Sequence, residues 1–132
     1  MANTRSHGIV HHVMGNASTA AVNAGKVIVQ GRPGKCMEVV GGHITALGGA
    51  ADTATSVDIK DTAGTAVVAV ACGVDGLTEN AQLDFDADAN VTRTTYRKPL
   101  TLGKSLQIEK TGEDVGTATS FDFYVEYVLV NP

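Results

Sequence analysis

The sequence predicts an all-β protein, folded as an antiparallel β-sandwich or jelly roll with an extended N-terminal arm. Residues 120–130 alternate apolar and polar positions, and four of the six Phe and Tyr residues lie there. Such period-two alternation is typical of a half-buried strand. About eight or nine short runs of strand-like sequence follow one another with turn residues between them. No amphipathic helix separates these runs, which disfavours a parallel α/β fold.

A single domain accounts for the chain, because 132 residues with 43% hydrophobic content can bury one core. Residues 1–24 are small and polar and are predicted as an extended N-terminal arm, whereas residues 25–132 are predicted as the β-sandwich domain. The arm contains a short apolar cluster of Ile9, Val10, Val13 and Met14. We expect this cluster to bind a partner surface, because unattached termini are disordered. The alternative is a first strand packed on the chain's own sheet.

The first strands of the body are separated by glycine-containing turns. Residues 26–30 and 35–40 are predicted as strands, joined by a turn at residues 31–34 in which Pro33 has a suitable fixed φ. The pair Gly41 and Gly42 is expected to end the second strand. Another strand is then predicted over residues 43–47, and residues 48–53 form a loop of small residues.

The second half of the chain continues the same pattern. Residues 55–60 place Val57 and Ile59 on one face, and a hairpin loop follows at 61–65. Residues 66–72 are the most continuous apolar run and indicate a buried strand. The remaining predicted strands are residues 83–85, 91–96, 106–110 and 120–130.

The closing strand, residues 120–130, has the clearest division into two faces. One face is predicted to line the core and consists of Phe121, Phe123, Val125, Tyr127 and Leu129. The opposite face consists of Asp122, Tyr124, Glu126, Val128 and Val130. We therefore expect this strand to complete the core.

Charge and hydropathy exclude several classes of partner. The net charge is −4, whereas nucleic-acid binders usually carry a basic patch. The densest basic cluster, Arg93, Arg97 and Lys98 around Tyr96, is interpreted as a solvated loop. The apolar run at residues 66–72 is too short to span a bilayer. We expect no nucleic-acid partner and no membrane partner. The N-terminus has no secretory signal, which favours production in a host cytoplasm.

The cysteines Cys36 and Cys72 do not match the spacing of a zinc motif. Each lies in or beside an apolar strand-like run. Buried free thiols are therefore predicted, since a disulfide would require an oxidising compartment.

The run Asp84, Asp86 and Asp88 resembles the first oxygen ligands of a calcium loop. The match ends at Ala89, where the loop needs Gly, and at Thr95, where it needs Glu. We therefore predict a solvent-facing strand and no metal site. A calcium-stabilised β-module is kept as a further alternative, in which a chelator lowers the melting temperature.

Catalytic motifs are absent from the sequence. His7 and His11 have the spacing of helical zinc ligands, but the neighbouring residues disfavour a helix, and His12 is also interpreted as incidental. No Gly-x-Ser-x-Gly nucleophile motif, P-loop or dinucleotide fingerprint occurs. Cys72 could meet His43 in space, but its apolar surroundings would raise its pKa. We predict no catalytic or cofactor-binding residue, no cofactor and no enzymatic activity.

Four features between Lys26 and Val130 are shared with a known class of viral protein. They are the strand pair with a Gly-Pro turn at 27–40, the strand 55–60 before a glycine loop, the Asp-Ala-Asp-Ala loop in a Thr- and Val-rich middle, and the aromatic last strand at 121–130. In these features the chain resembles small all-β bacteriophage virion structural proteins of the capsid decoration, cement or head-fibre type.

This resemblance implies a non-enzymatic virion structural protein that binds a viral capsid and decorates or cements it. It implies the major capsid protein or another virion protein as the partner, location in the virion, and a homo-oligomer, with a trimer favoured. The alternative is a ligand-binding β-sandwich, such as a phage tail receptor-binding module or a carbohydrate-binding module. Tyr96 and Tyr124 are the residues that could serve such a module, because sugars stack on exposed aromatic rings.

Overall fold

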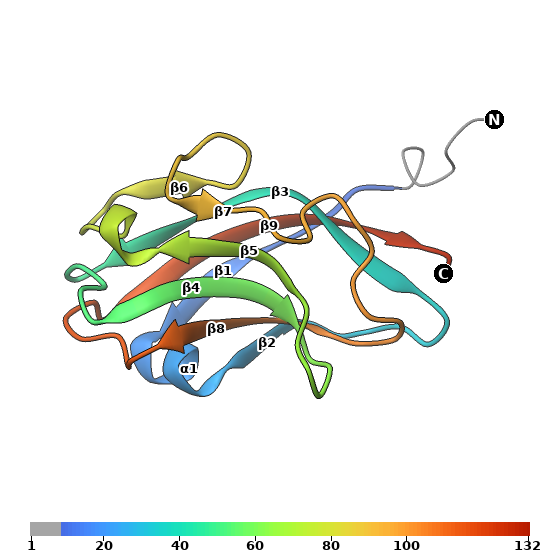
Figure 1. Ribbon diagram of the computed structural model, residues 1–132, viewed down its shortest axis with the longest axis horizontal. Coiled ribbons are helices and arrows are strands. Elements are labelled where there is room, and N and C mark those ends of the chain that lie inside the picture. The colour runs from blue at the N-terminus through green and yellow to red at the C-terminus, as the bar shows by residue number, and fades with distance from the viewer. Residues whose placement is uncertain (1–8) are drawn as a thin grey trace.

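The computed structural model describes residues 9–132 and is a sandwich of two antiparallel sheets, as predicted. Sheet A contains, in spatial order, β1 (His11–Ser18), β9 (Ser120–Val130), β3 (Cys36–Leu47) and β6 (Gln82–Asp84). Sheet B contains, in spatial order, β2 (Lys26–Val29), β8 (Leu106–Gly112), β4 (Ala54–Asp61), β5 (Val68–Gly73) and β7 (Val91–Thr92). In Figure 1, β4, β5 and β8 lie in front of β1, β9 and β3.

The strand order is that of a jelly roll, one of the two predicted arrangements. With β7 set aside, the strands pair as nested antiparallel hairpins: β1 with β9, β2 with β8, β3 with β6, and β4 with β5. The contacts of β9 with β3 and of β8 with β4 merge these hairpins into the two sheets. Eight strands that pair in this nested way across two sheets define the jelly roll.

The closing strand β9 divides its side chains between the two faces as predicted. Phe121, Phe123 and Val125 are buried in the core between the sheets, and Tyr127 and Leu129 pack against it. The burial of Phe121 and Phe123 removes a large aromatic area from water, and this is the main contribution of β9 to stability. The predicted boundaries of the strand, residues 120 and 130, are also those observed.

The opposite face of β9 differs from the prediction at its C-terminal end. Val128 and Val130 are buried there rather than exposed, in a small cluster with Cys36 and with the partly buried Val40. Cys36 and Cys72 are both free and buried, as predicted.

The segment predicted as an extended arm, residues 1–24, is part of the sandwich in its described portion. β1 pairs with β9 along its whole length, and α1 (Thr19–Ala24) follows, with the Ser18 hydroxyl accepting a hydrogen bond from the Ala21 amide at 3.1 Å. The core includes Ala17 and Val22 from this segment. Residues 11–18 thus form a first strand on the chain's own sheet, which was the alternative, and this strand pairs with backbone groups of β9. Residues 1–8 lie outside the described part of the chain.

The glycine pair Gly41 and Gly42 was expected to end a strand, but β3 runs through it for 12 residues. The register against β9 shifts between Val39 and Gly41, so one residue bulges out there. A bulge allows both halves of the strand to stay in one sheet. The prediction of two strands was wrong because a glycine pair in a sequence has the same appearance at a bulge and at a break.

The strand predicted over residues 91–96 is also shorter in the structure, since β7 ends at Thr92. The chain then crosses to sheet A and runs along β3. Its amides donate to β3 or to the residue before it, in the pairs Arg97–Val39 (2.9 Å), Leu100–Met37 (2.8 Å) and Gly103–Lys35 (2.8 Å). This loop therefore covers the part of the β3 edge that β6 leaves unpaired.

Candidate partner-binding face

The outward side of sheet A is the candidate partner-binding face, and we call it the outer face of sheet A. Pairing across the strands places three rows side by side. The rows are His12, Met14 and Asn16 of β1, Asp122, Tyr124 and Glu126 of β9, and His43 of β3. Asp84 of β6 lies opposite His43. These residues alternate with the core residues of the same strands, which is why they point away from the core.

The apolar cluster singled out in the sequence divides at this face. Ile9, Val10 and Met14 are 77%, 53% and 68% exposed, whereas Val13 is partly buried against the core. Large apolar side chains with such exposure are found together where a protein contacts another surface. Ile9, Val10 and Met14 are thus available to a partner, and Val13 is used by the fold.

A shallow depression of about 730 Å³ lies at the middle of the outer face. It is lined by Met14, Gly15, Asn16, His43, Asp122, Phe123 and Tyr124. A side chain at Gly15 would point toward the buried Phe123 ring, whose nearest atom would lie 3.0 Å from an added Cβ atom. An apolar side chain of a partner could enter it beside Met14.

Three rings form a row across the face, from β1 through β9 to β3. The ring of Tyr124 lies between those of His12 and His43, with centroid distances of 5.9 Å and 5.5 Å. The Tyr124 hydroxyl donates to a carboxylate oxygen of Glu126 at 3.0 Å, and this hydrogen bond raises the pKa of Tyr124. The Nδ1 atom of His43 is buried and has no hydrogen-bond partner among the described residues. The Tyr124 ring is thus stacked with the His43 ring and has the tilted His12 ring beside it.

Asp122 and Glu126, two carboxylates of the outer face, have no cationic partner in the described part of the chain. Asp122 accepts a hydrogen bond from the Asn16 amide at 2.9 Å, and Glu126 accepts the one from Tyr124. The ion pairs of the described residues use other carboxylates, those of Glu109, Asp86 and Asp114. The outer face of sheet A is thus both apolar and acidic.

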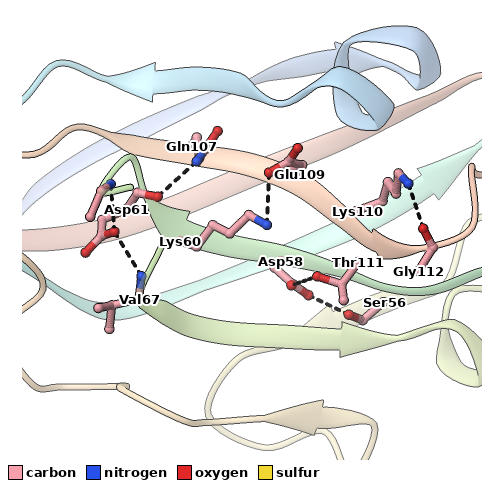
Figure 2. Close-up of polar contacts among 11 residues, drawn as sticks. Ser56, Asp58, Lys60, Asp61, Val67, Gln107, Glu109, Lys110, Thr111 and Gly112 are labelled. Carbon is pink, nitrogen blue, oxygen red and sulfur yellow. Dashed lines mark hydrogen bonds and ion pairs between the residues drawn. The ribbon is translucent and has the colours of Figure 1, made fainter. Parts of the chain in front are cut away.

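The outward side of sheet B is different, because its polar groups are paired with one another (Figure 2). Lys60 and Glu109 form an ion pair at 2.9 Å. Asp58, although only 2% exposed, accepts hydrogen bonds from the hydroxyls of Ser56 (2.6 Å) and Thr111. A buried polar group that is satisfied internally offers little to a partner.

The aspartate run predicted as a solvent-facing strand is a tight loop that is closed by an arginine. The carboxylates of Asp84 and Asp88 accept from the amides two residues ahead, at 2.9 Å and 2.8 Å. The Arg93 guanidinium donates to three carbonyl oxygens of the loop, those of Phe85, Asp88 and Val91. A fixed cation thus already lies among these oxygen atoms. Phe85, between Asp84 and Asp86, is buried in the core.

We expect the Arg93→Ala substitution to lower the free energy of unfolding by about 1–2 kcal/mol, because three loop carbonyls lose a charged donor. Arg32→Ala is the matched control, since the Arg32 side chain is exposed and makes no hydrogen bond to another residue within 9–132. Thermal unfolding with and without EDTA completes the measurement. A melting temperature that falls with EDTA would instead support the calcium-stabilised alternative.

Tyr96 lies beside this loop and is tied to it. Its hydroxyl donates to Asp86 at 2.7 Å, and the Arg97 guanidinium lies 5.2 Å from its ring centroid. The hydrogen bond from Tyr96 and the charge of Arg97 lower the pKa of Asp86. Burial and the Asp86 carboxylate raise the pKa of Tyr96. With Tyr124 flanked by histidines, neither tyrosine presents two free ring faces to a sugar.

The residues considered for chemistry are not brought together. Cys72 lies in the core, where burial first and the carboxylates of Asp58 and Asp88 next raise its pKa, whereas His43 lies on the outer face of sheet A. His11 lies in a strand and stacks on Tyr127 at 5.3 Å, while its spacing partner His7 is outside the described residues. Residues 9–132 contain no group of three or more His, Cys, Asp or Glu side chains arranged to hold a metal ion. None of the described helices has the length and apolar character needed to cross a membrane.

Comparison with known proteins gives a likeness in fold. No family model matches the chain, and no curated protein matches it. One similar solved chain belongs to the structure described as "Acidic stable capsid structure of Helicobacter pylori bacteriophage KHP30". The two chains have a TM-score of 0.50 and 17% sequence identity, over 94% of this chain and 93% of that chain. At this identity the likeness shows a shared fold.

Proposed function

We propose that the chain is a non-enzymatic structural protein of a bacteriophage virion that binds the capsid and decorates or cements it. The observation that carries the proposal is the match in fold over nearly the whole length of a chain from a bacteriophage capsid structure. The jelly-roll strand order is in keeping with this, since it is widely used in viral capsid domains. The major capsid protein, or another virion protein, is the proposed partner.

The binding surface in this proposal is the outer face of sheet A together with the exposed residues that precede β1. Ile9, Val10 and Met14 supply apolar area that a partner can remove from water. Symmetric copies of the protein, with a trimer expected, would strengthen weak single contacts through multivalent attachment. Sheet B would then face away from the capsid.

Sedimentation with capsids that lack the protein tests this function. We expect the purified wild-type protein to sediment with them and the double variant Val10→Asp, Met14→Asp to bind at least tenfold more weakly, because two exposed apolar contacts of roughly 1 kcal/mol each are replaced by charges. Leu102→Asp is the matched control, since Leu102 is 49% exposed but lies in a loop away from β1. Failure of the wild-type protein to bind such capsids would refute the proposed function.

A further inference from the structure

Within residues 9–132, the free edge of β1 lacks the charged residues, proline and bulges by which many proteins protect a sheet edge. It is eight residues long, keeps one register against β9, and contains no proline and no Lys, Arg, Asp or Glu. The other edge strands are shorter: β2 has four residues and a register shift, β6 has three and β7 has two. An exposed, long and regular edge is a template for pairing with another strand. Within residues 9–132, β9 is the strand to which β1 is hydrogen-bonded.

The direction of the backbone groups in sheet A follows from the loop beside β3. The carbonyls of Met37 and Val39 accept hydrogen bonds from the amides of Leu100 and Arg97, so these two residues of β3 point their backbone groups away from β9. In an antiparallel pair, residues that face each other alternate between bonded and non-bonded positions. Tyr127, which lies opposite Val39, therefore directs its backbone groups to the other side, toward β1.

The same alternation assigns the groups of β1. His11 lies opposite Tyr127, so His11 and every second residue after it are bonded to β9. The residues between them, His12, Met14 and Asn16, direct their amides and carbonyls to the free edge. These are also the residues whose side chains lie on the outer face of sheet A. One set of residues therefore offers both backbone groups and side chains to a partner.

We propose that an extended segment of the capsid partner adds to the free edge of β1 as a further strand and carries a Lys or Arg toward Asp122 and Glu126. This inference rests on the proposed function and names the chemistry of its partner. Strand addition supplies main-chain hydrogen bonds for affinity, and alternate side chains supply specificity. Here those side chains would meet Met14 and the depression beside it.

Charge complementarity favours a partner segment that carries Lys or Arg over a second copy of this chain as the added strand. The carboxylates of Asp122 and Glu126 lie one strand inward from the edge and form no ion pair in the described part of the chain. An added strand would lie two strand spacings from β9, roughly 9.6 Å, a gap that a Lys or Arg and a carboxylate side chain can bridge together. A second copy that paired through its own β1 would bring no Lys or Arg of that strand to these carboxylates.

The effect of a proline substitution in β1 on capsid binding tests the strand addition. His12→Pro removes an amide that points to the free edge, and edge strands tolerate proline there. His12→Ala is the matched control, because it removes the same ring and keeps the amide. We expect His12→Pro to weaken capsid binding more than tenfold with little change in melting temperature, and His12→Ala to weaken it less than threefold. Val13→Pro, which removes a bond to β9, should lower the melting temperature sharply.

The charge of the partner is tested with Asp122→Asn and Glu126→Gln combined, which keep the hydrogen-bond acceptors and remove both charges. We expect about tenfold weaker binding to capsids and a smaller dependence on salt concentration. Glu113→Gln, at an exposed carboxylate in the loop after β8, is the control and should bind like the wild type. Unchanged binding in the double variant would overturn the basic character of the occupant.

Amide hydrogen exchange can detect the strand addition in the wild-type protein. In the free protein we expect slow exchange at Val13 and Gly15 and fast exchange at His12, Met14 and Asn16. Capsid binding should slow the second set. Wild-type binding that leaves those amides fast, or that His12→Pro does not weaken, would overturn the strand addition and leave the proposed function standing. A wild-type dimer in solution that His12→Pro converts to a monomer would make a second copy the occupant and overturn the capsid segment.

Discussion

Gly42→Ala should lower the free energy of unfolding by about 4 kcal/mol and the melting temperature by roughly 15 °C. Gly42 has φ +135°, a conformation that residues with a Cβ atom rarely adopt. A Cβ atom there would lie 2.1 Å from the carbonyl oxygen of Tyr124 and 3.0 Å from the Cα atom of Val125. Since both contacts are with the backbone of β9, relief would require β3 and β9 to separate.

Two other glycines separate the cost of the positive φ from the cost of the steric contact. The free energy of unfolding of all three variants is measured by urea unfolding. Gly34 has φ +77° but no heavy atom within 4 Å of an added Cβ, so Gly34→Ala should cost only about 1 kcal/mol. Gly64 has open space and no such φ, so Gly64→Ala should change stability by less than about 0.5 kcal/mol. Equal losses at Gly42 and Gly34 would contradict the close approach of the two strands.

Asp61→Asn should lower the free energy of unfolding at pH 7 by about 2–4 kcal/mol. Asp61 is 1% exposed, and its carboxylate accepts three backbone hydrogen bonds, from Val67 (2.9 Å), Ala63 (3.1 Å) and Thr101 (2.9 Å). One carboxylate thereby holds the hairpin loop between β4 and β5 and the loop that covers β3. The amide nitrogen of asparagine would face an N–H group and leave it unpaired.

The same carboxylate makes stability depend on pH. Burial acts to raise the pKa of Asp61, but hydrogen bonds from Thr101, Val67 and Ala63 outweigh it, and the pKa is lowered. The unfolded value is about 3.9, so the contribution is complete above about pH 5 and is lost as the pH falls through the lower folded value. We expect Asp61→Asn to flatten the decline of stability between about pH 5 and pH 2. Asp52→Asn, at an exposed aspartate, should unfold like the wild type, and an equal slope in all three proteins would contradict this assignment.

The parts of the fold that follow from local pattern could be predicted from the sequence. Alternation in the closing strand identified its boundaries, its core face and the sandwich, because the side-chain period of a strand is fixed. The described part of the arm was misread because β1 contributes few large residues to the core; Ala17 and Val13 carry a weak signal. Its strand character comes from pairing with β9, which no local pattern contains.

The candidate face could be predicted only in part for the same reason. Exposed apolar residues in a polar segment were visible in the sequence as Ile9, Val10 and Met14. The row formed by His12, Tyr124 and His43 depends on the register of three strands that are far apart in the chain. Likewise, the use of Arg93 as the cation of the aspartate loop depends on a turn whose geometry a spacing rule does not give.

The nested pairing of strands has a consequence for the order in which the protein can fold. The hydrogen-bonded side chains Asn16 and Asp122 join the outermost strands across 106 residues, whereas β4 and β5 close a short hairpin in the middle of the chain. Closing long loops costs more chain entropy and slows folding. The inner hairpins can form while synthesis continues, but β1 has no partner until β9 has left the ribosome. During that interval β1 is not part of a sheet. The long free edge that β1 later provides therefore forms only when β1 pairs with β9, after the inner hairpins.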